Sequence, residues 1–385
     1  MSKKNIVTVI GTRPEAIKCA PIILALANES WANPITLTTA QHRELLDDAF
    51  KDLGIAADVD LNLMKPGQSL SEITGRAFTA LEPALKSLKP DMVLAQGDTT
   101  TVMVVATVCF YLGLPFCHIE AGLRTGDLRN PFPEEYNRIV AGRTAALHFA
   151  PSERARTALL NEGVPAPDIF VTGNTGIDTL VSFKERTLPL NLHLPPEARL
   201  ILVTSHRREN FGEPMRDAFM GLLDVLASHS DAHILFPVHP NPNVVEMVNT
   251  LLANHPRVHL REPLQYREFV AALKAAHFVV TDSGGVQEEA PVFGKPVLVM
   301  RQETERPEAV SCGVSKLIGT QRKNVFDSCD DLLVNPTAYS EMSTGISPYG
   351  DGLAAQRIVR ILADRLGVVS NTPPFEPFEI RAATK

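Results

Sequence analysis

The sequence is poor in cysteine and tryptophan. Its 385 residues include five cysteines and one tryptophan, and aromatic residues make up 6% of the chain. The cysteines follow no spacing typical of a zinc site or of a disulfide-bonded secreted domain. We therefore expect reduced thiols, as in a cytosolic protein, at Cys19, Cys109, Cys117, Cys312 and Cys329.

The sequence also lacks a long hydrophobic run and an excess of basic residues. No apolar run reaches the roughly 18 residues that a membrane-spanning helix needs. Met1-Ser2-Lys3-Lys4 leads directly into a predicted strand without a signal-peptide core, so we expect a cytoplasmic protein with no membrane partner. The 37 Lys and Arg residues are outnumbered by 44 Asp and Glu residues, and this net charge of −7 argues against nucleic-acid binding. Any anionic ligand must be held by locally placed arginine and lysine.

Motifs for metals and dinucleotide cofactors are absent or incomplete. The chain has no His-Glu-x-x-His and no Gly-x-x-x-x-Gly-Lys-Ser/Thr. His118-Ile119-Glu120 has the His-x-Glu of zinc deaminases, but no Pro-Cys-x-x-Cys follows it. The segment 350–355 fits the dinucleotide pattern Gly-x-Gly-x-x-Ala, yet no strand is predicted before it, so we interpret it as a helix start. We expect no metal and no cofactor.

The chain does contain a regular alternation of short apolar strands and helices. This pattern predicts βαβ units and parallel sheets. The expected strands are 5–10, 35–40, 92–95, 115–119, 147–150, 169–172, 200–204, 234–238, 258–260, 278–281, 295–300 and 315–318. The expected helices are 16–28, 43–53, 69–88, 100–111, 138–146, 152–162, 214–228, 244–253, 266–276, 325–333 and 353–366.

The alternation breaks at 180–198. Leu188-Pro189-Leu190 and Leu194-Pro195-Pro196 indicate a surface connection between domains there. We therefore predict an α/β fold with two doubly wound, Rossmann-like domains facing across a cleft, residues 1–176 and 177–352. The polar tail 368–385 is expected to be loosely ordered.

One stretch, 278–290, has the features of a phosphate site. A buried strand is followed by Ser283-Gly284-Gly285 and then by a helical segment. The free N–H groups at a helix start favour negative charge, and glycine lets a phosphate approach the backbone closely. Glu289 would be placed to accept hydrogen bonds from ribose hydroxyls. The alternative is an ordinary strand-to-helix turn.

Polar residues follow strand after strand in both halves. In open α/β sheets ligands bind at the carboxyl ends of the strands, so this repetition predicts a polar site there. The segments are Gly11-Thr12-Arg13-Pro14-Glu15, Gly97-Asp98-Thr99-Thr100, Glu120-Ala121-Gly122, Ser205-His206-Arg207-Arg208-Glu209, His239-Pro240-Asn241-Pro242-Asn243 and Ser283-Gly284-Gly285.

The charged members of these segments each have a functional and an ordinary interpretation. Arg13 and Lys18 lie near the start of a helix, where positive charge is unfavourable because of the helix dipole. A bound anion nearby would remove this unfavourable interaction, but an ordinary solvated helix start also fits. Arg306 is a candidate phosphate ligand or a surface ion pair. Carboxylates and imidazoles in one cleft suit acid–base chemistry, but each alone is more often structural. They are Asp98, Glu120, Glu134, Glu135, His206 and His239.

The chain resembles the bacterial non-hydrolysing UDP-N-acetylglucosamine 2-epimerases. The resemblance runs in order from about Asn5 to the last helix and does not cover the tail beyond Val368. It is carried by Ile10-Gly11-Thr12-Arg13-Pro14-Glu15-Ala16-Ile17-Lys18, Ala40-Gln41-His42-Arg43, Gly97-Asp98-Thr99-Thr100, His118-Ile119-Glu120-Ala121-Gly122-Leu123-Arg124-Thr125, Pro133-Glu134-Glu135, His206-Arg207-Arg208-Glu209-Asn210, Thr281–Glu289 and Thr304-Glu305-Arg306-Pro307-Glu308.

This resemblance implies an isomerase with the two-domain glycosyltransferase-B fold, whose C-terminal helix 353–367 packs back on the first domain. It implies interconversion of UDP-GlcNAc and UDP-ManNAc for cell-surface polysaccharide synthesis, and a homodimer. The C2 proton is not acidic enough to be removed alone. Loss of UDP together with this proton gives 2-acetamidoglucal, and re-addition from the other face inverts C2.

The resemblance also implies roles for residues. The acid–base candidates are Asp98, Glu120 and Glu134, and His206 would contact the departing phosphate or the sugar. The diphosphate would be bound by Arg13, Ser283, Gly284, Gly285 and Arg306. Lys18 would also lie at the site. Glu289 would bind the ribose and the segment from Leu264 to Phe269 the uracil. Some relatives carry Gln at the position of Leu264, so a backbone contact is implied there.

Some relatives have a second, regulatory UDP-GlcNAc site. Gln41, Arg207 and His239 match it, whereas Glu44 and Gly67 differ from the Gln and Arg of such relatives. The residues therefore leave allosteric activation open.

Three other functions remain as alternatives. A retaining glycosyltransferase of the same fold would bind a nucleotide sugar at the same glycine turn. An epimerase for a 2,3-diacetamido sugar nucleotide would carry Ala-Arg-Pro-Gln and Gly-Gln-His where this chain has Thr12-Arg13-Pro14-Glu15 and Ala40-Gln41-His42. A non-catalytic nucleotide-sugar sensor is disfavoured because no candidate catalytic position is lost.

Overall fold

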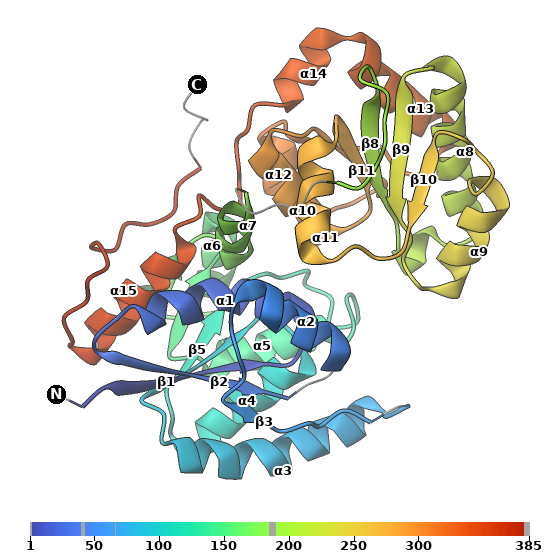
Figure 1. Ribbon diagram of the computed structural model, residues 1–385. Coiled ribbons are helices and arrows are strands. Elements are labelled where there is room, and N and C mark those ends of the chain that lie inside the picture. The colour runs from blue at the N-terminus through green and yellow to red at the C-terminus, as the bar shows by residue number, and fades with distance from the viewer. Residues whose placement is uncertain (1, 40–42, 66, 185–189, 381–385) are drawn as a thin grey trace. The chain divides into compact units, whose positions relative to one another are not determined.

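The computed structural model describes residues 2–39, 43–65, 67–184 and 190–380, and for 43–45 only the helical backbone. The chain forms two compact units. The first comprises the residues up to Thr179 together with Tyr349–Glu379, and the second comprises Leu180–Pro348. Figure 1 shows a sheet with helices on it in each unit.

The first unit is built on a seven-stranded parallel sheet in the order β3-β2-β1-β4-β5-β6-β7. Its strands are β1 (Lys4–Ile10), β2 (Ala32–Thr38), β3 (Val59–Asp60), β4 (Met92–Gln96), β5 (Phe116–Ile119), β6 (Leu147–Ala150) and β7 (Ile169–Val171). Its helices are α1 (Arg13–Ala27), α2 (Arg43–Leu53), α3 (Leu70–Leu88), α4 (Thr100–Leu112), α5 (Glu134–Thr144), α6 (Glu153–Asn161), α15 (Ala354–Leu366) and most of α7 (Thr175–Phe183).

The sheet of the first unit is covered on both faces. In Figure 1, α1, α2 and α15 lie above it and α3 and α4 lie below it. Valines of β1 and β4 pack with Leu81, Leu85, Val104 and Val105 in one buried core. A parallel sheet is buried on both faces, which explains why its strands are continuous apolar runs.

The second unit repeats this architecture with a six-stranded parallel sheet in the order β10-β9-β8-β11-β12-β13. Its strands are β8 (Arg199–Thr204), β9 (Ala232–Pro237), β10 (Val258–Arg261), β11 (Phe278–Thr281), β12 (Val297–Val299) and β13 (Ser315–Leu317). Its helices are α8 (Glu213–Ser228), α9 (Pro242–Leu251), α10 (Tyr266–Ala275), α11 (Gly284–Glu289), α12 (Pro307–Ser311), α13 (Arg322–Val334) and α14 (Pro336–Met342).

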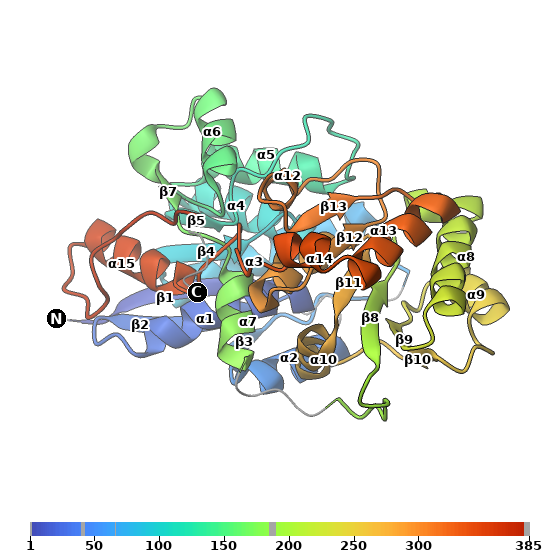
Figure 2. The same ribbon diagram turned by 90° about the horizontal axis from the view of Figure 1, so that it is seen from above.

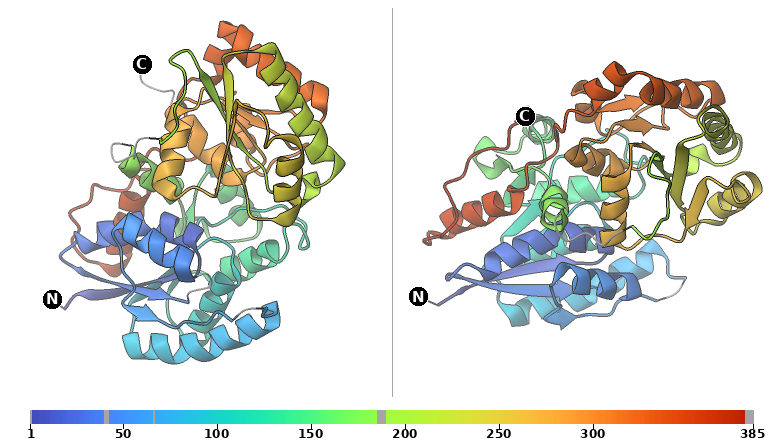
Figure 3. Two further views of the ribbon diagram at one scale, coloured as in Figure 1. Left: turned by 45° about the vertical axis from the view of Figure 1, so that its right-hand side comes forward. Right: turned by 45° about the horizontal axis from the view of Figure 1, so that its top comes forward.

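Two separate cores hold this second sheet. Residues of α8, α9 and α13 pack on one face, and residues of α10 and α11 pack on the other. Figure 3 shows helices on both sides of this sheet. In both sheets the strand order reverses next to the first strand, at β1/β4 and at β8/β11. The prediction of two Rossmann-like α/β domains is therefore confirmed, and ligand sites are expected at these two switch points.

The last helix belongs to the first unit. Helix α15 packs against α1, and Figure 2 shows it beside β1 and α1. Asp178 of α7 accepts a hydrogen bond from the Ala355 N–H, with 2.7 Å between Oδ1 and N. A carboxylate at this position satisfies a free donor in the first turn of α15.

The segment after α15 was expected to be loosely ordered. Residues 368–380 form no helix or strand, but residues 368–379 make specific contacts within the first unit. The Phe378 N–H donates to the Val171 carbonyl at 2.8 Å, and Phe375 packs edge-on against Phe170. Asn371 N–H donates to the buried carboxylate of Glu29 at 3.1 Å. The two hydrogen bonds satisfy the carbonyl at the end of β7 and the carboxylate of Glu29 between α1 and β2.

Two expectations about secondary structure were wrong. Helix α5 begins at Glu134 rather than at residue 138, because Pro133 and two glutamates form a favourable helix start. Residues 180–183 belong to α7 rather than to a surface connection. Leu180 and Phe183 are buried, and Phe183 packs edge-on against Tyr266. Leu188 and Pro189 lie outside the described residues, which resume at Leu190. Across the described part of the chain, no helix is long and apolar enough to span a bilayer.

Candidate active site

A pocket lies at the carboxyl ends of β1, β4 and β5 in the first unit. It is lined by Thr12, Arg13, Pro14, Glu15, Lys18, Gln96, Gly97, Asp98, Thr99 and Glu120. The strands end at one edge of the sheet, so residues far apart in the sequence meet there. Four of the predicted site residues thus share one pocket, namely Arg13, Lys18, Asp98 and Glu120. Glu134 is not among the residues that line it.

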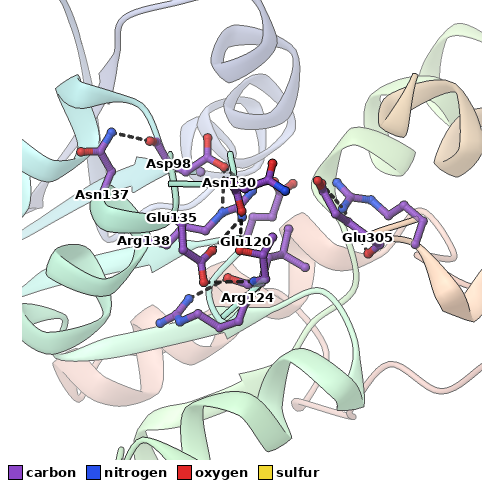
Figure 4. A network of polar contacts seen from close by, with 12 residues as sticks. Asp98, Glu120, Arg124, Asn130, Glu135, Asn137, Arg138 and Glu305 are labelled. Atoms are coloured by element: carbon purple, nitrogen blue, oxygen red, sulfur yellow. Dashed lines mark hydrogen bonds and ion pairs between the residues drawn. The ribbon is translucent and has the colours of Figure 1, made fainter. Parts of the chain in front are cut away.

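Asp98 is held in place by Asn137, by Arg138 and by the backbone conformation of the preceding residue. Its backbone carbonyl accepts from Asn137 Nδ2 at 2.8 Å, and its Oδ2 lies 2.6 Å from Arg138 Nη2 and 2.9 Å from Arg138 Nε (Figure 4). The preceding residue, Gly97, has a φ of 84°, and its carbonyl lies 2.7 Å from His118 Nε2. A side chain at position 97 would be strained in this left-handed conformation. Asp98 is not the helix cap, since Thr99 caps α4.

Glu120 forms an ion pair with Lys18 across the pocket. It follows β5 with a φ of 63°, which is uncommon for a residue other than glycine. Such strained conformations cluster at functional sites, where they fix the direction of a side chain. The pair joins the β5 end to α1, so the predicted acid–base residue and a predicted cation are in direct contact.

Glu134 and Glu135 occupy the first turn of α5, but they face different surroundings. Glu135 is buried and accepts from the N–H groups of Thr125 and Gly126, both at 3.0 Å, and from Arg138 Nη1 at 3.1 Å. One carboxylate oxygen of Glu134 is buried and has no hydrogen-bond partner among the described residues. A buried acceptor without a partner calls for an explanation, and a ligand donor would supply one. Glu135 is therefore structural, and Glu134 remains the candidate for chemistry.

Glu15 is a further pocket residue to which the sequence analysis assigned no role. Its Oε2 accepts from the Gly11 and Thr12 N–H groups at 2.5 and 2.8 Å, and its Oε1 accepts from Thr99 Oγ1 at 2.5 Å. It ties the loop that carries Arg13 to the loop that carries Asp98. Burial raises the pKa of Glu15 to about 7, and the charge of Asp98 adds to this, while the three hydrogen bonds act in the opposite direction.

We expect Glu15 to make stability depend on pH. Its folded-state pKa of about 7 lies above the ordinary glutamate value of 4.5, so its stabilising contribution is complete below pH 4.5 and is lost as the pH rises through 7. A shift of this size corresponds to about 3 kcal/mol of unfolding free energy. In Glu15→Gln the amide oxygen can accept from the Gly11 and Thr12 N–H groups, and the NH2 group can donate to Thr99 Oγ1, so all three contacts can persist without a titrating group. Urea unfolding from pH 5 to 8 should therefore show a flatter profile for this variant.

Asp178→Asn provides the matched control for this measurement. Burial also raises the pKa of Asp178 to about 7, and Asp178 lies outside the pocket. It should flatten the pH profile of stability in the same direction. An unchanged profile for Glu15→Gln beside a flattened one for Asp178→Asn would contradict the prediction for Glu15.

In the second unit, the glycine turn after β11 starts α11 as predicted. Ser283 is the N-cap residue, Gly284 and Gly285 are the first helical residues, and Glu289 is the last. A methyl carbon at Gly284 would lie 3.8 Å from Nη2 of both Arg207 and Arg306, and one at Gly285 would meet open space. Two guanidinium groups and a helix start therefore converge at the turn, which is the chemistry of an anion site.

Arg306 is oriented by a buried acid. Its guanidinium forms an ion pair with Glu288, which is 5% exposed. Its backbone N–H donates to Thr304 Oγ1 at 3.0 Å. Thr304 in turn donates to Gln287 Oε1 of α11 at 2.7 Å. This network fixes the loop before α12 against α11. The alternative of a solvent-exposed ion pair is wrong, because the Arg306 side chain is 11% exposed.

The other predicted residues of this unit lie on three elements. His206 follows β8, and its ring stacks on that of His239 with 5.4 Å between centroids. Burial lowers the pKa of His206, with Arg207 and His239 acting in the same direction and Asp282 against them. Leu264 and Phe269 are half-buried against the core of β8, β11 and α10.

Two of the three regulatory candidates lie among the described residues. Arg207 lies beside the glycine turn, and His239 lies beside His206. Gln41 lies outside the described residues.

Residues missed by the sequence analysis are mainly those that hold the others. Arg138, Asn137 and Glu288 are buried polar residues that contact candidates from other elements. A signal existed for Glu15, since Thr12-x-x-Glu15 is a capping-box pattern. Arg138 follows Glu135 by three residues on one helix face, which also favours pairing.

Among the described residues, no group of three or more His, Cys, Asp or Glu side chains is arranged to bind a metal.

Comparison with known proteins identifies the family. The family model described as UDP-N-acetylglucosamine 2-epimerase matches residues 24–363. The chain is 46% identical over 368 residues to the UDP-N-acetylglucosamine 2-epimerase of Escherichia coli strain K12, covering 93% of this chain and 98% of that one. It is 45% identical over 374 residues to the Bacillus subtilis strain 168 enzyme, covering 97% and 98%.

A solved structure agrees with this result. The crystal structure of the Neisseria meningitidis UDP-GlcNAc 2-epimerase bound to UDP-GlcNAc matches with a TM-score of 0.87 and 42% identity, covering 94% of this chain and 100% of that one. The chain therefore belongs to the UDP-N-acetylglucosamine 2-epimerase family.

Proposed function

We propose that this protein interconverts UDP-GlcNAc and UDP-ManNAc by eliminating UDP to form 2-acetamidoglucal and then adding it back. The main support is the pocket lined by Asp98, Glu120 and Lys18. Asp98 and Glu120 follow the neighbouring strands β4 and β5, and they form ion pairs with Arg138 and Lys18, respectively. The Escherichia coli relative is named a UDP-N-acetylglucosamine 2-epimerase, and the Neisseria meningitidis relative is described as bound to UDP-GlcNAc.

The reaction requires two kinds of group. In the elimination, a base takes the proton from C2 while the bond between C1 and the UDP oxygen breaks and the electron pair leaves with UDP. In the return step, the UDP oxygen re-forms its bond to C1 and an acid delivers a proton to the opposite face of C2. Asp98, Glu120 and Glu134 are the proposed acid–base groups, since positioned carboxylates perform such transfers.

The second unit supplies the proposed diphosphate ligands. Ser283, Gly284, Gly285 and Arg306 bind the diphosphate, and Arg207 and His206 lie next to them. Arg13, which lines the pocket of the first unit, is the remaining proposed diphosphate ligand. Glu289 binds the ribose, and the Leu264–Phe269 segment binds the uracil. Cations around the departing group stabilise its charge and keep it bound while the glycal exists.

The test is to incubate the protein with UDP-GlcNAc in deuterated water and follow C2 by NMR. Deuterium at C2 together with a second UDP-sugar is the expected result. UDP with free N-acetylmannosamine would indicate a hydrolysing enzyme. No exchange without an added acceptor would indicate a glycosyltransferase or a sensor, and exchange of a 2,3-diacetamido sugar nucleotide but not of UDP-GlcNAc would indicate the related epimerase.

The biological setting is also a proposal. The product would feed cell-surface polysaccharide synthesis, and the enzyme would work as a cytoplasmic homodimer, as the family resemblance implies. Sedimentation or light scattering of the purified protein tests the homodimer directly.

A further inference from the structure

One buried carboxylate in the second unit, Asp282, receives hydrogen bonds from an entire neighbouring loop. It directly follows β11 and precedes the Ser283-Gly284 turn, and its side chain is 0% exposed. The loop that begins after β8 surrounds it. This loop, residues 205–210, carries His206 and Arg207.

The donors to this carboxylate are numerous and come from main chain and side chains alike. The His206 N–H lies 3.0 Å from both Asp282 oxygens, and the Arg207 N–H lies 3.1 Å from Oδ2. Ser205 Oγ donates to Oδ2 at 2.9 Å, and Asn210 Nδ2 donates to it at 3.1 Å. A buried carboxylate is tolerated only when it is paired or fully hydrogen-bonded, so these donors and Asp282 depend on one another.

The contact with the imidazole gives Asp282 a second effect. His206 Nδ1 lies 3.5 Å from Asp282 Oδ1. A carboxylate facing one ring nitrogen favours a proton on that nitrogen, which leaves Nε2 as the nitrogen directed away from Asp282. The other charged and titratable groups acting on His206 are Arg207 and His239.

We propose that Asp282 is a positioning residue that fixes His206 with its proton on Nδ1 and holds the backbone of His206 and Arg207 to the start of the diphosphate-binding turn. The functional consequence rests on the proposed epimerase activity, whereas the position and tautomer of His206 do not. Because Asp282 and Ser283 are adjacent in the chain, the glycine turn and the two side chains beside it are held as one unit.

Asp282→Asn is the informative substitution. The amide oxygen can take the place of Oδ2, which keeps four of the donors, and the NH2 group then faces Nδ1 of His206. An NH2 group donates to Nδ1 rather than accepting from it, so the neutral imidazole must carry its proton on Nε2. We expect a tautomer switch in 15N-detected NMR of histidine-labelled protein, and a fall in kcat of at least about 10-fold with a smaller change in KM.

Ser205→Ala is the matched control, because it removes one donor but leaves the carboxylate in front of Nδ1. It should keep the Nδ1–H tautomer and change kcat by less than about threefold, since one neutral hydrogen bond is lost. UDP affinity, measured by calorimetry for each variant, reports on the glycine turn separately from turnover. Equal kcat losses in Asp282→Asn and Ser205→Ala would show general loosening of the loop and would contradict the proposal.

The wild-type protein provides a test that does not depend on whether Asp282→Asn folds. A neutral His206 in the wild type that carries its proton on Nε2 would overturn the proposal. A wild-type protein with the Nδ1–H tautomer but no exchange at C2 of UDP-GlcNAc would leave the positioning role intact and reject the proposed activity instead. The two conclusions can therefore fail separately.

Discussion

Replacing Asp98 with asparagine is expected to lower kcat by about 100- to 10,000-fold, the range typical of a lost general acid or base. Asparagine has the size of aspartate but cannot accept or deliver the C2 proton. The Asn137 contact is to the backbone carbonyl of residue 98, so it survives the substitution. The rate of UDP-sugar interconversion and the rate of deuterium entry at C2 should fall together, while UDP affinity should change by less than about threefold because no hydrogen bond to the nucleotide is removed.

Asp364→Asn is the matched control for this experiment. Asp364 is an exposed residue of α15 in the first unit, and it pairs with Arg360. The same chemical change at this position should leave kcat unaltered. Far-UV circular dichroism and thermal unfolding would establish that Asp98→Asn is folded, because Arg138 loses a charged partner in this variant. A folded Asp98→Asn protein that turns over within threefold of the wild-type rate would remove Asp98 from the mechanism.

Replacing Arg306 with methionine is expected to weaken UDP binding by about 10- to 100-fold, since a hydrogen bond to a charged group contributes about 1.5–3 kcal/mol. The guanidinium is held by Glu288 with its Nη2 near Gly284, so it is already placed for a diphosphate at the helix start. Preorganised side chains lose little entropy on binding. Calorimetric titration with UDP measures this loss directly.

Two further variants separate charge from geometry at Arg306. Arg306→Lys keeps the charge but loses the planar fork, so its UDP affinity should fall between those of the wild type and Arg306→Met. Arg322→Met removes an exposed arginine of α13 that pairs with Asp224 in the same unit, and it should leave UDP affinity unchanged. Equal affinities for Arg306→Met and Arg322→Met would show that Arg306 does not contact the diphosphate.

The two variants test different steps of the proposed reaction. Asp98→Asn should bind UDP and fail in proton transfer, whereas Arg306→Met should bind UDP poorly. A protein that acts as a nucleotide-sugar sensor would show the second effect without any measurable activity to lose. The combination of the two results therefore discriminates the epimerase from the binding protein.

Much of the secondary structure could be predicted because it depends on local patterns. The bounds of α2 and β6 agree with the expectation, since apolar residues at helical or strand spacing are visible in a short window. The Ser283-Gly284-Gly285 turn was also recognisable, because glycine after a buried strand marks a close backbone approach. Errors arose where long-range packing decides the outcome, as at 180–183, where Phe183 is stabilised by Tyr266 from a distant helix.

The candidate site divides in the same way. The residue types that carry the proposed chemistry, such as Asp98, Glu120 and Arg306, were evident from their places at predicted strand ends and from family motifs. Their partners were not, because Arg138 meets Asp98 and Asp282 meets His206 only after distant strands have paired in register. Sequence spacing indicates partners only within one element, as for Glu135 and Arg138, and not between distant elements.

By itself, the amino-acid sequence determined the α/β class, the family and the set of groups available for acid–base chemistry and anion binding. These properties follow from local hydrophobic spacing and from side-chain chemistry. Only the tertiary structure decided which carboxylates are held by Arg138 or Lys18, and which nitrogen of His206 faces a carboxylate. The reason is that charge pairing and hydrogen-bond direction depend on distances of a few ångströms between residues that are distant in the chain. Lys18 and Glu120 are 102 positions apart, and His206 and Asp282 are 76 positions apart.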